Sequence, residues 1–137
     1  MKKISLISSV LVLCCFALIS WQTQQDEVMV RGKKVYNLYC LSCHAADGSG
    51  MENLNPPLIK TKGVTGDKSK LIGIILKGMN VHEPINGKVY TNTMAPLDYL
   101  TDQQISDVLT YIRKSFGNKA SAVTPGEVKA EREKLNE

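Results

Sequence analysis

The chain has 137 residues, of which 43% are apolar and 22% charged, and its formal net charge is +4. This length fits one domain of ordinary size and excludes a large enzyme scaffold, and the composition is globular rather than disordered. Lys2 and Lys3 lie in an apolar amino-terminal segment, so the net charge beyond residue 21 is only +2. We therefore expect no nucleic-acid partner, because such proteins carry strongly basic surfaces.

Residues 1–21 have the pattern of an export signal. Two lysines precede a mostly apolar run of 16 residues, from Ile4 to Ile19, which is typical of secretory signals. The cleavage pattern is poor, Cys14 or Cys15 could accept a lipid, and the run is at the short limit for a retained membrane anchor. We predict an exported protein, in the periplasm or on the outer face of the cytoplasmic membrane, and leave cleavage, lipidation and retention open.

The chain beyond this segment is predicted to be helical and rich in loops. Apolar residues at three- and four-residue spacing predict a helix over residues 28–41. Residues 45–66 are rich in Gly, Asn, Pro and Asp and are predicted to form a loop. A second helix is predicted over residues 68–77, where Asp67 suits the amino-terminal cap and Gly78 the carboxy-terminal stop.

The last third of the chain carries further local signals. Asn86-Gly87 predicts a tight turn. Thr101, followed three residues later by glutamine, has the form of a capping box and predicts a third helix ending near Gly117. Another helix start lies at Thr124, and the charged run after it is expected to be a surface helix or a frayed end. Three short helices and a long loop bury little apolar surface, so the fold is expected to rely on a disulfide, metal or cofactor.

The five residues from Cys40 to His44, Cys-Leu-Ser-Cys-His, form the attachment signature of a c-type haem. On a helical turn, Cys40 and Cys43 face the same side, so both sulfurs can reach one porphyrin edge while His44 presents its imidazole to the iron. A zinc site would have only these three residues and His82 as ligands. A thioredoxin-like pair requires a βαβ context, and a plain disulfide explains neither His44 nor the small core. We predict one covalently bound haem c with His44 as an iron ligand.

Three short patterns accompany this motif: Gly32-x-x-x-Tyr36 before it, Asn55-Pro56-Pro57-Leu58 after it, and Met94-Ala95-Pro96 before the third helix. With them, the chain from about residue 30 to residue 117 resembles a small class I cytochrome c. The resemblance implies the all-α cytochrome c fold, in which terminal helices cross where Gly32 lacks a side chain. It also implies a proline carbonyl that holds the second ring nitrogen of His44, and Pro56 fits best, with Pro57 second.

The resemblance extends to the end of the chain. Residues 115–125 resemble a cytochrome variant found alone or attached to oxidases, nitrite reductases and quinoprotein dehydrogenases, which implies an oxidase, reductase or dehydrogenase as redox partner. The predicted parts are a signal peptide or membrane anchor (1–21), a linker (22–29), a cytochrome c domain (30–117) and a carboxy-terminal extension (118–137).

The sixth iron ligand is predicted to be Met94. This residue follows an extended stretch that can carry a thioether across the haem, and Pro96 restricts the backbone just beyond it. Met51, Met79 and His82 remain alternatives. Leu58 is predicted to pack against the haem. Further candidates for haem packing are equally compatible with an ordinary core or surface: Ile59, Leu71, Ile75, Leu97 and Tyr90.

The function that these residues favour is one-electron transfer without substrate chemistry, so we predict a protein that is not an enzyme. It requires iron ligands from the protein on both sides of the haem. Two alternatives remain open: a gas-binding or peroxidatic haem with an open or displaceable sixth position, and an exported binding module without haem whose cysteines form a disulfide.

Overall fold

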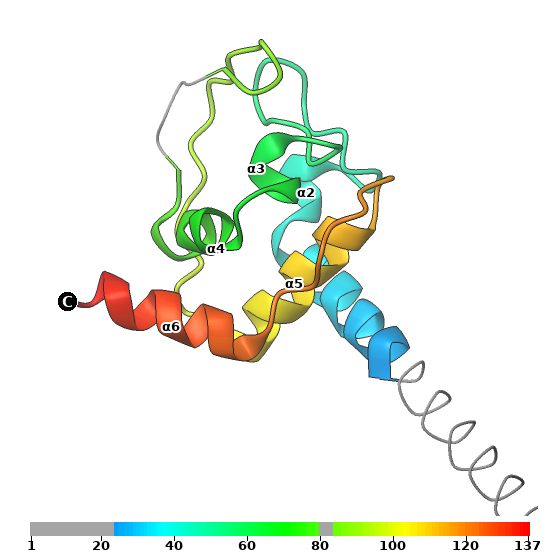
Figure 1. Ribbon diagram of the computed structural model, residues 1–137. Helices are drawn as coiled ribbons and strands as arrows, with labels where there is room; N and C mark the ends of the chain where they lie inside the picture. Colours follow the sequence, from blue (N-terminus) through cyan, green and yellow to red (C-terminus); the bar gives the residue numbers. More distant parts are fainter. Residues whose placement is uncertain (1–23, 80–83) are drawn as a thin grey trace, which may run out of the picture.

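The computed structural model describes residues 24–79 and 84–137 (Figure 1). Residues 24–39 are helical, and five further helices follow in chain order: α2 (Leu41–His44), α3 (Lys62–Thr65), α4 (Lys68–Lys77), α5 (Asp102–Lys114) and α6 (Pro125–Leu135). Between residues 24 and 137, the described part contains isolated β-bridges and no strand. The prediction of an all-α fold is confirmed.

The first helix differs from its predicted bounds. Residues 24–29, which we predicted as a linker, are helical and continue into the rest of the first helix, which runs to residue 39 rather than 41. Polar composition alone does not separate a linker from an exposed helix, because Gln and Glu are good helix formers. The predicted signal or anchor, residues 1–21, lies outside the described residues. Within those residues, no helix has the length and apolarity needed to cross a membrane.

A close crossing joins the first helix to α5, which it passes behind in Figure 1. A Cβ atom on Gly32 would collide with the carbonyl oxygen of Asp107 and would lie 2.7 Å from Cβ of Tyr111. Beside it, Nε of Arg31 donates to the buried carboxylate of Asp107 at 2.7 Å. Tyr36 packs against Tyr111 with ring centroids 5.5 Å apart. The absence of a side chain at Gly32 therefore sets the distance between the two helices, as the resemblance implied.

Helices α4 and α5 supply most of the core. The predicted bounds of α4 are confirmed, and the side chain of Asp67 accepts from the backbone N–H of Lys70 at its start. The capping box of α5 at Thr101 is also confirmed. Both helices bury the apolar residues that their periodicity predicted: Leu71, Ile72, Ile75 and Leu76 of α4, and Ile105, Val108, Leu109 and Ile112 of α5. Helix α3 was not predicted; it forms where Thr61 caps a single turn inside the expected loop.

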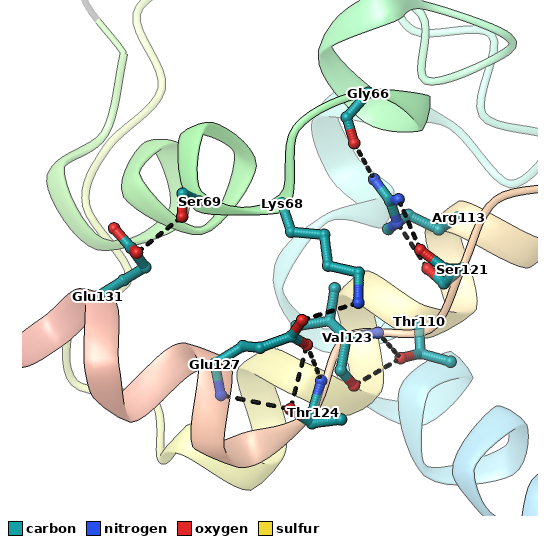
Figure 2. Close-up of polar contacts among 10 residues, drawn as sticks. All are labelled: Gly66, Lys68, Ser69, Thr110, Arg113, Ser121, Val123, Thr124, Glu127 and Glu131. Carbon is teal, nitrogen blue, oxygen red and sulfur yellow. Dashed lines mark hydrogen bonds and ion pairs between the residues drawn. The ribbon is translucent and has the colours of Figure 1, made fainter.

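Helix α6 is packed rather than frayed. It begins with a second capping box, at Thr124, and buries Val128 completely, and it contacts both α4 and α5. Figure 2 shows the polar contacts that hold this region to α4 and α5: Lys68–Glu127 at 2.8 Å, Ser69–Glu131 at 2.7 Å, and Thr110 with the backbone of Val123 at 3.1 and 3.0 Å. The predicted carboxy-terminal extension thus covers α4 and α5 as part of one folded body.

Candidate functional site

A cavity of about 330 Å³ lies among α2, α4, α5 and the loops that precede α3 and α5. Its volume is within the range typical of small-molecule and cofactor sites. All six residues that the sequence singled out line it: Cys40, Cys43, His44, Pro56, Leu58 and Met94. Most of the remaining lining is apolar, including Val64, Leu71, Ile74, Ile75, Leu97, Leu109 and Ile112. The cavity therefore suits a large, mainly apolar group.

The Cys-x-x-Cys-His motif lies where the first helix gives way to α2. The helical hydrogen bonding continues through it, because the N–H of Cys40 donates to the carbonyl of Tyr36 and the N–H of His44 donates to the carbonyl of Cys40, each at 2.9 Å. Both thiols are free; that of Cys40 is buried and that of Cys43 is exposed. Burial, with a smaller contribution from Cys43, raises the pKa of Cys40 to about 11. The Cys40 thiol therefore stays protonated at neutral pH.

His44 is held in one tautomer. Its Nδ1 lies 3.0 Å from the carbonyl oxygen of Pro56, and a carbonyl only accepts, so Nδ1 must carry the proton and donate. Burial lowers the pKa of His44 below its ordinary value, and the Pro56 carbonyl partly opposes that shift. The ring is thus neutral, with an unprotonated Nε2, which is the form that binds iron.

The loop after the motif brings Pro56 to this position through its backbone. The N–H of Gly50 donates to the carbonyl of His44 at 3.1 Å, and the N–H of Leu58 donates to the carbonyl of Gly48 at 2.8 Å. Gly50 has φ of +74°, and a Cβ atom there would lie 2.7 Å from the Pro56 carbonyl oxygen. A residue with a side chain would therefore push away the carbonyl that orients His44.

Met94 lies on a short backbone pairing at another part of the cavity wall. It forms an isolated antiparallel bridge with Met79, with both N–H···O distances at 2.9 Å. A Cβ atom on Gly78, which has φ of +74°, would collide with the carbonyl oxygen of Met94. Three residues further on, the N–H of Leu97 donates to the carbonyl of Ile75 in α4 at 2.8 Å. The backbone around Met94 is thus tied to the end of α4.

The other proposed sixth ligands differ in position. Met79 also lines the cavity, beside Met94. Met51 is 43% exposed and is not among the lining residues. His82 lies outside the described residues. Among the packing candidates, Leu71, Ile75 and Leu97 line the cavity with Pro57, whereas Ile59 and Tyr90 do not.

An amide pair in the lining was not predicted. Nδ2 of Asn92 donates to Oδ1 of Asn55 at 3.2 Å, and the backbone N–H of Asn92 donates to the carbonyl of Leu54 at 3.0 Å. These bonds join the loop that carries Pro56 to the stretch that carries Met94. Asn55 and Asn92 are 37 residues apart, and no local pattern in the sequence indicates such a pairing.

The residues present fit a haem. Two free thiols three residues apart, a neutral imidazole and an apolar cavity are what covalent attachment and iron ligation require. Within the described residues, which leave out His82, no three or more His, Cys, Asp and Glu side chains are grouped so that they could hold a metal ion. The disulfide alternative is not what the structure contains, since Cys40 and Cys43 are unbonded.

Comparisons with known proteins agree with this geometry. The family model for cytochrome c matches residues 29–116. The chain is 34% identical over 101 residues to the cytochrome c subunit of a quinone-dependent alcohol dehydrogenase from Gluconobacter oxydans, which covers 72% of this chain and 20% of that protein. It is 37% identical over 94 residues to the gluconate 2-dehydrogenase cytochrome c subunit of Pantoea cypripedii, with 66% and 21% covered.

A third relative is similar in size to this chain. Cytochrome c-552 of Thermus thermophilus is 28% identical over 126 residues, which cover 76% of this chain and 95% of that protein. By contrast, the chain spans only about a fifth of the two dehydrogenase subunits. The fold and the cofactor that the sequence predicted are confirmed: the chain belongs to the cytochrome c family, a family of electron carriers with a covalently bound c-type haem and its iron.

Proposed function

We propose that this protein is a one-electron carrier in which Cys40 and Cys43 attach the haem and His44 and Met94 bind the iron. The observation that carries the proposal is that one apolar cavity is lined by both thiols, by an imidazole in its metal-binding tautomer and by a methionine with a fixed backbone. When bound, the haem supplies a one-electron couple at its iron. The protein holds the ligands in place so that they remain the same in both oxidation states.

The apolar lining has a part in this function. Leu58, Leu71 and Leu97 keep water from the buried part of the site, which favours the less charged, reduced state of the iron and raises the reduction potential. A thioether ligand acts in the same direction. With protein ligands on both sides, no position is left for a substrate or for oxygen, so we propose that the chain is not itself an enzyme.

The partner is proposed to be another redox protein, namely a dehydrogenase, a reductase or an oxidase. Two of the relatives are named as cytochrome c subunits of dehydrogenases, which supports a dehydrogenase as electron donor. We also propose that the protein is exported, to the periplasm or the outer face of the cytoplasmic membrane, on the pattern of residues 1–21. Intact mass of the purified protein and its distribution between soluble and membrane fractions test export and anchoring.

The visible spectrum of the protein from a host that attaches haem tests the ligand assignment. Low-spin ferrous bands that survive acid-acetone extraction are expected, with a weak far-red sulfur-to-iron band in the ferric state. Met94→Ala should abolish the far-red band and lower the potential, whereas Met79→Ala and His82→Ala should leave the band in place. Loss of the band only in His82→Ala would overturn the assignment, and high-spin bands in the wild type would favour a gas-binding or peroxidatic haem instead.

A further inference from the structure

Asn118 is a buried polar residue whose side chain is fully used. Only 4% of it is exposed, and it lies in the turn after α5, which ends at Lys114. Its Nδ2 donates to the carbonyls of Ile112 at 2.8 Å and Leu58 at 3.0 Å. Its Oδ1 accepts from the backbone N–H of Lys60 at 2.7 Å. Both donor hydrogens and the acceptor oxygen are therefore engaged, each with a backbone group.

These bonds reach the haem site across a long stretch of sequence. Leu58 and Lys60 are 60 and 58 residues from Asn118, and Leu58 lines the cavity two residues after Pro56. The other side of Leu58 is held as well, because its N–H donates to the carbonyl of Gly48. The segment that contains the Pro56 carbonyl is thus fixed between the loop after the motif and the end of α5.

We propose that Asn118 is a positioning residue for the haem site: it holds the 56–60 segment so that the Pro56 carbonyl accepts from Nδ1 of His44. The effect on the iron rests on the proposed ligation by His44. A hydrogen bond from Nδ1 increases the electron donation of the imidazole and stabilises the ferric state. Loosening the segment therefore weakens that bond and raises the reduction potential.

Hydrogen exchange of the reduced holoprotein tests this proposal. In Asn118→Ala, we expect the His44 Nδ1–H and the backbone N–H of Leu58 to exchange about tenfold faster relative to the N–H of Leu109 in the core of α5, as loss of one buried hydrogen bond predicts. The potential should rise in the same variant. Asn118→Asp keeps the acceptor for Lys60 and loses the donors to Leu58 and Ile112, so exchange at His44 and Leu58 should speed up as well; because it adds a negative charge, the potential is compared in Asn118→Ala only.

Thr110→Ala is the matched control. Thr110 is also buried on α5 and also bonds to the backbone of another segment, at Val123, but neither residue lines the cavity. It should lower stability without changing the His44 exchange ratio or the potential. If Thr110→Ala and Asn118→Ala gave the same exchange ratio for His44 and the same reduction potential, the proposal would be overturned. Asn118 would then act only through general stability.

If the variants fail to fold, a measurement on the wild-type protein still tests the proposal. If Asn118 holds the segment, its side-chain N–H protons and the Nδ1–H of His44 should show the same dependence of exchange on denaturant, because they open together. Different dependences would also overturn the proposal. The wild-type spectrum tests the proposed function separately, because high-spin bands would reject an iron with protein ligands on both sides while the exchange comparison still reports the bond to Pro56.

Discussion

The α5–α6 region and the two loops around the cavity are stabilised in different ways. Helices α5 and α6 each begin with a capping box, and they bury a continuous set of apolar side chains. The loops over residues 45–60 and 84–97 have no helix; backbone hydrogen bonds and glycine contacts hold them, and much of their apolar surface faces a cavity. Contacts between its own helices stabilise most of the first region, whereas the second depends more on what fills the cavity.

Removing both cysteines that attach the haem should have the largest effect on stability. We expect Cys40→Ala with Cys43→Ala to leave the chain largely unfolded, because a cavity of about 330 Å³ costs up to about 8 kcal/mol at about 24 cal/mol per Å³, comparable with the whole stability of a small domain. Circular dichroism during thermal unfolding is the measurement. Ser42→Ala, an exposed change inside the motif, is the control. A cooperative, native-like melt of the double variant would contradict the expectation.

Gly32→Val should have the next largest effect. Its side chain would meet the backbone of Asp107 and Cβ of Tyr111, so the first helix has to move away from α5, at a cost of about 3 kcal/mol. Gly73→Ala in α4 is the control, because no atom lies within 4 Å of its new Cβ; it should stabilise by about 0.5–1 kcal/mol. Urea midpoints measure both. A similar gain in stability in both variants would show that the crossing of the first helix and α5 tolerates a side chain at residue 32.

The same contrast explains what the sequence could predict. Asp67 and Gly78 bound α4, and the Thr101 capping box starts α5, because these signals act over a few residues. The motif likewise identified the cofactor, since both thiols and the histidine lie within a single turn. All six candidate residues lie at one cavity, although their roles toward the haem remain predictions.

Contacts between distant segments could not be predicted from the sequence. The Asn55–Asn92 pair and the Asn118–Leu58 bond join segments 37 and 60 residues apart, and only the folded chain brings them together. The packing of α6 was missed for a related reason: it has one fully buried apolar residue, Val128, and polar contacts complete its docking. Apolar periodicity therefore underestimated how firmly it is held.

Gly78→Ala should affect Met94 more than the fold. Gly78 and Gly87 have φ of +74° and +78°, so an alanine at either position costs about 1–2 kcal/mol of backbone strain. Only at Gly78 would the new Cβ also collide with the Met94 backbone, since Gly87 has no atom within 4 Å of that position. We expect the far-red band to weaken in Gly78→Ala and to remain in Gly87→Ala, as ferric spectra can measure. An equally strong far-red band in the two variants would indicate that the backbone pairing of Met79 with Met94 does not position Met94.

The smallest effect is expected from the charge of Glu127, which does not line the cavity. Burial raises the pKa of this carboxyl, but hydrogen bonds from Lys68 and from Thr124 outweigh burial and bring it below its ordinary value of 4.5. A carboxyl with a lowered pKa in the folded state stabilises the protein above its unfolded pKa and loses that contribution as the pH falls through the folded value. Because the ion pair between Lys68 and Glu127 is partly exposed, its contribution to stability should be at most about 1 kcal/mol.

Glu127→Gln keeps a capping side chain for Thr124 and removes the charge. The difference in stability from the wild type should therefore be present at neutral pH and should shrink below about pH 4.5. Urea unfolding at neutral pH and below about pH 4.5 measures this difference in stability. Glu133→Gln, at an exposed residue of the same helix, is the control. A difference that does not change with pH would mean that the packing of α6 does not depend on this charge.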